Sequence, residues 1–123
     1  MKTFEVEERS SAQYKATLKD EAGVVIALSD LTTIAATIYS EDSPTKAVVN
    51  SRNAQDIKNA NGGTFHATSG LLTLDLSAGD NQVLDAALPR ERHVLQLDFT
   101  YNGGAKTGRH RARLVILNLA KVS

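Results

Sequence analysis

Apolar and polar residues alternate along several short stretches of the chain. Between residues 12 and 19, for example, Tyr14, Ala16 and Leu18 alternate with polar side chains. A period of two residues is typical of a β-strand with one buried face and one face in water. From this alternation, and from short apolar runs bounded by turn residues, we expect strands over residues 12–19, 24–28, 31–39 and 72–76, with shorter ones over 47–49 and 64–67.

The strongest alternation lies near the C-terminal end. Residues 102–108, Asn-Gly-Gly-Ala-Lys-Thr-Gly, tolerate positive φ and separate two alternating stretches, which predicts a β-hairpin. Its first arm turns His93, Leu95, Leu97, Phe99 and Tyr101 to one side. Its second arm is expected to turn Ala112, Leu114 and Ile116 to the core and Arg109, Arg111 and Arg113 to solvent.

Residues 50–63 are the least strand-like part of the chain. Within them, residues 53–60 are expected to form a turn or two of helix. Ser51 or Asn53 would cap this helix, and the glycines at 62 and 63 would end it. The sequence therefore predicts one short helical crossover between strands.

A chain of 123 residues fits one domain. Many short strands with turn residues between them favour a sandwich or a barrel, because a sheet with one apolar face must bury it against another sheet. We expect a single all-β domain over residues 1–123. Residues 1–10, in which Phe4 and Val6 alternate with glutamates, form either an edge strand or an extended N-terminal arm.

Composition then narrows the chemistry. The 14 lysines and arginines balance the 14 aspartates and glutamates, so no net field draws the molecule to nucleic acid or anionic lipid. The chain has no cysteine, which excludes disulfides, thiolate metal sites and cysteine nucleophiles. Neither a signal-peptide core nor an apolar stretch of about 20 residues is present, so we expect synthesis in the cytoplasm and no membrane partner.

The histidines do not indicate a metal site or an active site. His66, His93 and His110 have no recognised metal-ligand spacing. His93 is expected to point inward and bond a backbone carbonyl, although Glu91 has the same parity and can hydrogen-bond beside it. No serine stands in a nucleophile-elbow context that would complete a triad. We predict no catalytic residues, no metal and no cofactor, and an enzyme would require Glu91, His93 and a hydroxyl to converge in one pocket.

A basic cluster is the feature with the clearest functional potential. It comprises Lys106, Arg109, His110, Arg111 and Arg113, next to the hairpin tip at Asn102 and Gly103. Outward arginines on one strand can pair with carboxylates of a partner protein. The same charges can also be a solvated face that protects a sheet edge from aggregation, and both interpretations stay open. Nucleic acid is the less favoured partner, because three tyrosines and three phenylalanines supply few stacking platforms.

Six segments of the chain carry a resemblance to a known family. They are Lys-Asp-Glu-Ala-Gly at residues 19–23, residues 48–62, Leu-Thr-Leu-Asp-Leu-Ser-Ala-Gly-Asp at 72–80, residues 91–101, Thr-Gly-Arg-His at 107–110 and residues 115–120. Together they resemble small virion proteins of tailed bacteriophages. The likeness runs from about residue 12 onward and is one of general pattern, so no functional residue transfers with it. It implies an immunoglobulin-like antiparallel β-sandwich of about seven to nine strands, assembled in several copies at the head, neck or tail.

We therefore expect a non-enzymatic virion protein that stabilises or connects other virion proteins, as a head–tail neck connector or a capsid decoration protein. Its partners would be other virion proteins and further copies of itself. Its docking elements would include Lys106, Arg109, Arg111, Arg113, Asn102 and Gly103. The alternative is a glycan- or cell-surface-binding sandwich of a tail or baseplate, for which Tyr39, Phe65 and Tyr101 are the candidate aromatic platforms.

Overall fold

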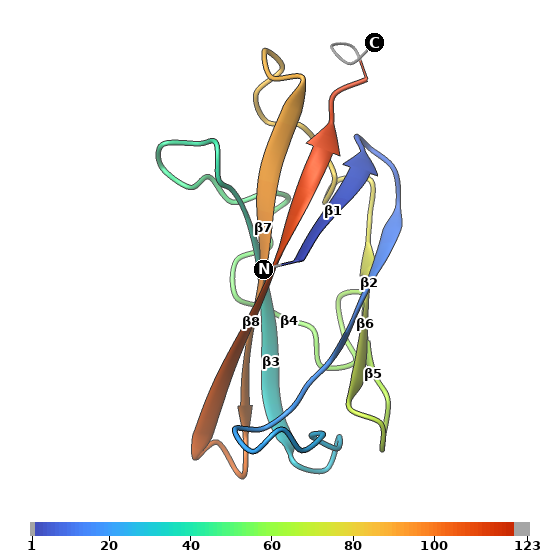
Figure 1. Ribbon diagram of the computed structural model, residues 1–123, viewed down its shortest axis with the longest axis vertical. Coiled ribbons are helices and arrows are strands. Elements are labelled where there is room, and N and C mark those ends of the chain that lie inside the picture. The colour runs from blue at the N-terminus through green and yellow to red at the C-terminus, as the bar shows by residue number, and fades with distance from the viewer. Residues whose placement is uncertain (1, 120–123) are drawn as a thin grey trace.

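The computed structural model describes residues 2–119, and it is built from strands in two layers (Figure 1). A five-stranded sheet has the order β1-β8-β7-β3-β4, and a three-stranded sheet has the order β2-β6-β5. The strands are β1 (Lys2–Glu7), β2 (Ala12–Thr17), β3 (Leu31–Ser40), β4 (Gln55–Asp56), β5 (Gly63–Phe65), β6 (Leu71–Leu76), β7 (Arg90–Tyr101) and β8 (Lys106–Leu117). The prediction of an all-β protein with two packed sheets is confirmed.

The β7–β8 hairpin is the longest element of the larger sheet. Its register pairs Arg90 with Leu117 and Tyr101 with Lys106. The residues predicted to face inward on β8 are at most 2% exposed, which confirms the predicted alternation. Gly108 lies opposite Phe99, and a methyl group on it would overlap the Phe99 ring, so a glycine is required inside this strand.

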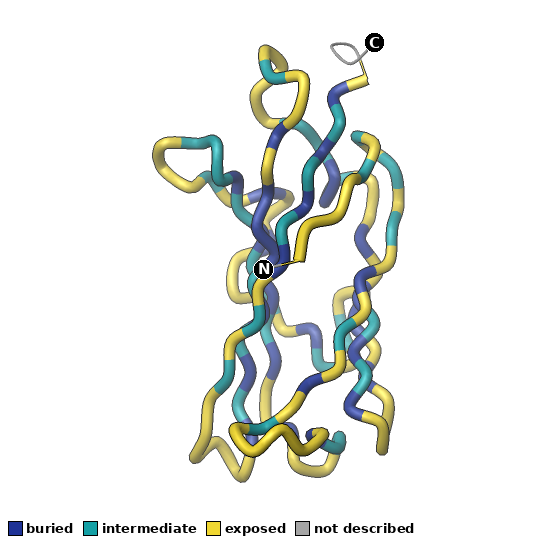
Figure 2. The backbone as a smooth tube through the Cα atoms, in the orientation of Figure 1, coloured by how far each residue is buried: buried dark blue, intermediate teal, exposed yellow. Residues whose placement is uncertain are grey.

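The core lies between the two sheets and is formed by the inward side chains of both (Figure 2). From the larger sheet come Ile34, Ile38, Leu95, Leu97 and Leu114, and from the smaller sheet come Tyr14, Phe65, Leu72 and Leu74. Ile57, in the connection between β4 and β5, is fully buried as well. No helix within residues 2–119 is long and apolar enough to cross a membrane.

The predicted helical crossover over residues 50–63 is wrong. This segment forms turns, the short strand β4 and the first residue of β5, and contains no helix. Five of its non-glycine residues have positive φ, which an α-helix does not allow. They are Asn50, Ser51, Ala54, Asn59 and Asn61.

Two further expectations need correction. The sheets are not purely antiparallel, because the edge strand β1 runs parallel to β8, with Phe4 opposite Leu114. The segments predicted as strands over 24–28 and 47–49 form only isolated bridges, between Lys19 and Val25 and between Tyr39 and Val48. In both segments the chain turns away after a single pair, so no ladder develops.

Candidate interaction surface

The outer face of the larger sheet carries the predicted arginines, and each of them has a hydrogen-bond partner. Nε of Arg109 lies 2.6 Å from Oδ1 of Asp98, its register partner on β7. Nε of Arg111 donates to Oε1 of Gln96 at 2.9 Å, again directly across the β7–β8 pair. We call Arg109, Arg111 and Arg113 the arginine stripe.

The third arginine of the stripe reaches a different strand. Nε of Arg113 lies 2.6 Å and its Nη2 3.1 Å from the two carboxylate oxygens of Glu41, the residue after β3. Next to it, Arg92 of β7 holds Asp42 through its guanidinium and its backbone N–H. These pairs cross β8, β7 and the end of β3, so they fix the side chains of the face in register.

The three arginines of the stripe therefore differ in how far their charge is already offset within the chain. Burial opposes ionisation of Asp98, but hydrogen bonds from Arg109 and Gln96 outweigh it and lower the pKa of the Asp98 carboxyl. Asp98 and Glu41 thus offset Arg109 and Arg113. Arg111 donates to the neutral Gln96 and forms no salt bridge within residues 2–119, although its charge also helps to lower the pKa of Asp98.

The hairpin tip continues this surface at the end of the molecule away from the C-terminus (Figure 1). Asn102 and Gly103 are exposed and have φ values of 53° and 68°, as the turn requires. Lys106 at the base of the tip contacts the carboxylate of Glu21 from the β2–β3 connection. The structure thus places the tip and the stripe along one strand pair.

His110 does not belong to this surface, although the sequence grouped it with the arginines. Its parity on β8 turns it inward, where Nε2 contacts the hydroxyl of Tyr14 on the other sheet. Burial, and then the charge of Lys2, lower the pKa of His110, while burial raises the pKa of Tyr14. At neutral pH the imidazole is therefore neutral and shares a hydrogen bond with the Tyr14 hydroxyl.

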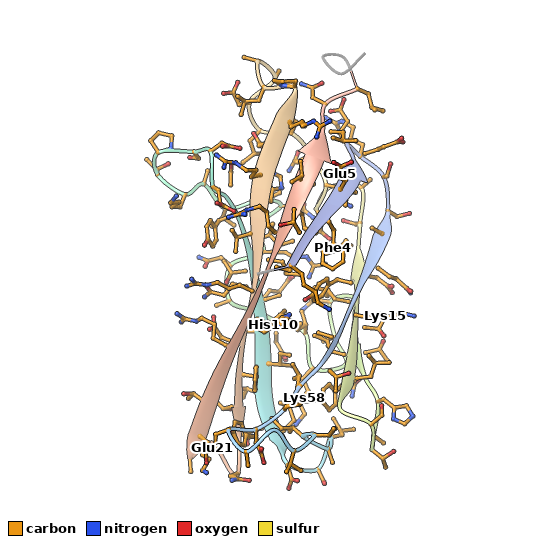
Figure 3. All side chains as sticks on the ribbon, in the orientation of Figure 1. Phe4, Glu5, Lys15, Glu21, Lys58 and His110 are labelled. Carbon is orange, nitrogen blue, oxygen red and sulfur yellow. The ribbon has the colours of Figure 1, made fainter. Side chains whose placement is uncertain are left out.

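A cleft of about 670 Å³ opens beside this contact, between β8 and β2. Phe4 of β1 is 41% exposed and stacks edge-on against Tyr14 at a centroid distance of 5.7 Å. Figure 3 shows Phe4 between β1 and β2, and Lys15 on β2, on the side away from β1. Sequence patterning did not find this cleft, because it joins residues of β1 and β2 with residues of β6 and β8 that are distant in the chain.

A buried ion pair is a second feature that patterning missed. The guanidinium of Arg52 donates to both oxygens of Asp80, from Nε at 2.8 Å and from Nη2 at 3.0 Å. Asp80 is fully buried and Arg52 is 7% exposed. Burial opposes ionisation of Asp80, but hydrogen bonds from Arg52, Asn50 and Ser77 outweigh it and lower the pKa of the carboxyl. The two side chains bind each other inside the protein, which indicates a structural role.

Glu91 and His93 lie side by side, as their parity allowed, but both are enclosed. Oε2 of Glu91 contacts Nε2 of His93, so the histidine bonds a carboxylate and not the expected backbone carbonyl. The same carboxylate accepts the backbone N–H groups of Leu84 and Asp85. Ser40 is the register partner of His93 and is also buried. All three side chains are at most 1% exposed, and Ser40 and Glu91 line a pocket of about 200 Å³ next to Asp42 and Leu84.

The proposed aromatic platforms are mostly part of the core. Phe65 and Tyr101 are 4% and 5% exposed, and Tyr39 is partly buried on the outer face of β3. Within residues 2–119, no group of three or more histidine or carboxylate side chains is placed to hold a metal ion. Accessible polar groups lie on the arginine stripe, on the hairpin tip and in the cleft beside Phe4.

Comparison with known proteins adds one distant structural similarity. No protein-family model and no curated protein sequence matches the chain. Among solved structures, the chain is similar to an endo-β-1,4-mannanase from Thermotoga petrophila, with 14% sequence identity and a TM-score of 0.47. The similarity covers 95% of this chain and 18% of that chain. At this level it carries no argument about function.

Proposed function

We propose that this chain is a non-enzymatic structural protein of a tailed-phage virion. It stabilises or connects other virion proteins, at the head–tail neck or as capsid decoration. The observation that carries the proposal is the outer face of β8, β7 and β3, where charged side chains stand in fixed register on a sheet. Side chains that are already ordered lose little entropy on docking, and arginine is enriched in protein interfaces.

We also assign the sandwich to the immunoglobulin-like class. When the strands are named in the immunoglobulin order, the larger sheet reads A′-G-F-C-C′ and the smaller one reads B-E-D. The parallel pairing of β1 with β8 corresponds to A′ beside G in that scheme. This assignment supports the phage resemblance of the sequence, which implies an immunoglobulin-like domain in a symmetric assembly.

Arg111 is the residue of the stripe best suited to a partner carboxylate. Arg109 and Arg113 already have carboxylate partners, whereas Arg111 holds only the amide of Gln96. An ion pair with a partner acid would replace a hydrogen bond to a neutral acceptor. In a docked interface, loss of such a buried charge pair costs about 2–5 kcal/mol.

Mass spectrometry of purified phage particles tests the proposal directly. We expect the protein in the particles at a fixed copy number, and we expect the isolated chain to sediment as an oligomer. The variant Arg111→Glu should fold normally and be depleted from particles, whereas the control Arg9→Glu, on the β1–β2 connection, should incorporate normally. Absence of the wild-type protein from particles would refute the virion role. Normal incorporation of the Arg111 variant would show that the stripe is only a solvated face.

A further inference from the structure

Two strand edges border the cleft beside Phe4. β1 pairs with β8 only from Ala112 to Leu117, so over residues 106–111 β8 has a strand neighbour on its β7 side alone, as far as residues 2–119 show. Figure 1 shows the same arrangement, with β1 starting about halfway along the molecule. Across the cleft, β2 pairs with β6 on one side and with no described strand on the other. An unpaired edge is a template for another strand.

The direction of the hydrogen bonds defines which groups of β2 are free. Just after β2, the N–H of Leu18 donates to the carbonyl of Gly70, at 2.9 Å, on the β6 side. Backbone groups of alternate residues in a strand point to opposite edges. The N–H and C=O groups of Gln13, Lys15 and Thr17 therefore point away from β6, towards the edge of the smaller sheet that no described strand covers.

The side chains around this edge favour a particular kind of strand. Tyr14 and Ala16 turn inward from β2, whereas Lys15 is exposed on the outer face. A strand added beside β2 would place alternate residues against Tyr14 and Phe4, where apolar side chains fit. Its other residues would lie beside Lys15, where acidic side chains fit, because cross-strand neighbours of opposite charge attract.

The charges lining the cleft agree with this pattern. Lys2, Lys15, Lys19 and Arg111 all border it, and no carboxylate does. Lys2, Lys15 and Lys19 form no ion pair with any residue between 2 and 119. The cleft is thus a cationic and aromatic groove within a chain of zero formal net charge.

We propose that the free edge of β2 docks an extended segment of a partner protein in which apolar and acidic residues alternate. The segment adds a fourth strand to the smaller sheet by β-augmentation, with its apolar residues on Phe4 and Tyr14 and its acids beside the lysines. This site goes beyond the proposed function, because it is centred on the free edge of the smaller sheet, with Arg111 of the arginine stripe reaching only its rim. The proposed ligand of this edge is therefore an extended strand and not the surface of a folded domain.

The competing explanation is that the lysines only protect the edge from aggregation. The two explanations predict different effects of Lys15→Ala. If Lys15 recognises an acidic strand, its loss weakens binding of that strand. If it is only protective, its loss leaves such binding unchanged and increases self-association of the chain.

The test uses the whole chain labelled with ¹⁵N and a short synthetic peptide in which valine and glutamate alternate. We expect chemical-shift changes and slowed hydrogen exchange at the amides of Gln13, Lys15 and Thr17. Thr17→Pro should still fold, because proline is tolerated at a sheet edge, but it removes one outward N–H and should abolish peptide binding. The matched control Thr17→Val keeps this N–H and should bind the peptide normally. Lys15→Glu, which keeps every backbone group, should weaken binding about fivefold and remains informative if the proline variant does not fold.

Several outcomes would overturn the proposal. One is the absence of amide shifts at about 1 mM peptide. Another is equal binding of a peptide in which valine and lysine alternate. Stronger perturbation of the same amides by oligothymidylate would assign the groove to nucleic acid, and protection of these amides by self-association would assign it to a second copy. Each result leaves the detection of the wild-type protein in particles unaffected, so failure of the strand proposal does not decide the virion proposal.

Discussion

Replacement of Asp80 by alanine should destabilise the protein more than any change to a surface charge. The Asp80 carboxylate accepts five hydrogen bonds, from Arg52 Nε and Nη2, Asn50 Nδ2, and the N–H and Oγ of Ser77. Arg52 in turn donates to Gln55 and to the backbone carbonyl of Asn61. One ion pair therefore ties the β3–β5 connection to the turn after β6.

The expected loss follows from the burial of this pair. Asp80→Ala would leave the guanidinium of Arg52, which is 7% exposed, without a counter-charge inside the protein. Breaking a buried pair in this way costs about 3–5 kcal/mol, out of a total stability of about 5–15 kcal/mol for a typical domain. The double variant with Arg52→Met should lose less than the sum of the two single losses, because it leaves no orphaned charge.

Urea unfolding followed by far-UV circular dichroism measures these losses. The control is Asp75→Ala, which removes an exposed carboxylate with a single side-chain hydrogen bond, to Gln13, and should cost less than about 1 kcal/mol. The lowered pKa of Asp80 adds a second readout. Its stabilisation is complete above the ordinary value of 3.8 and is lost as the pH falls through its folded-state pKa, so the variant should lack this acid dependence. A loss for Asp80→Ala as small as that of the control would refute the assigned role.

Three further predictions concern the core and the cleft. Gly108→Ala places a methyl group into the Phe99 ring and should lower stability by about 1–3 kcal/mol, and unchanged thermal melting would contradict the close packing. Leu95→Ala empties a fully buried site and should cost about 2–5 kcal/mol in urea unfolding, with a smaller loss showing that the sheets close over the gap. The pKa of His110 is lowered, so its contribution to stability is complete above 6.5 and declines as the pH falls below that value. Urea titrations at neutral and mildly acidic pH should show this decline in the wild type and not in His110→Asn.

The hairpin was predictable because its information is local. Alternation alone gave the inward residues of β8, and all of Ala112, Leu114 and Ile116 are buried. It also gave the outward direction of the arginine stripe. It did not give the acceptors Asp98, Gln96 and Glu41, because these depend on the register of β8 against β7 and on the position of the chain after β3. Register is a long-range property that a single strand pattern does not contain.

The prediction of a helix over residues 50–63 was wrong for a related reason. Its composition suits a helix cap and a helix end, but asparagine also accepts positive φ and bonds nearby backbone groups. Asn61 donates to the carbonyl of Asp56, and Asn59 accepts from the N–H of Phe65. The decisive partner, Asp80, lies 28 residues from Arg52. The helix propensity of residues 50–63 was therefore overridden by the pairing of Arg52 with Asp80, which a short stretch of sequence does not reveal.

The order of the strands links the fold to both proposed surfaces. Since β1 pairs with β8 and not with β2, it extends the larger sheet and leaves the smaller sheet with a free edge. The same pairing begins at Ala112, so it leaves His110 next to the cleft while Arg111 reaches its rim from the outer face. Arg111 is thus shared by the stripe and the cleft, and Arg111→Glu should weaken both particle incorporation and binding of the acidic peptide. Lys15 borders the cleft but does not belong to the arginine stripe, so Lys15→Glu should weaken peptide binding and leave particle incorporation unchanged. An equal effect of both variants on incorporation would show that the two surfaces act as one.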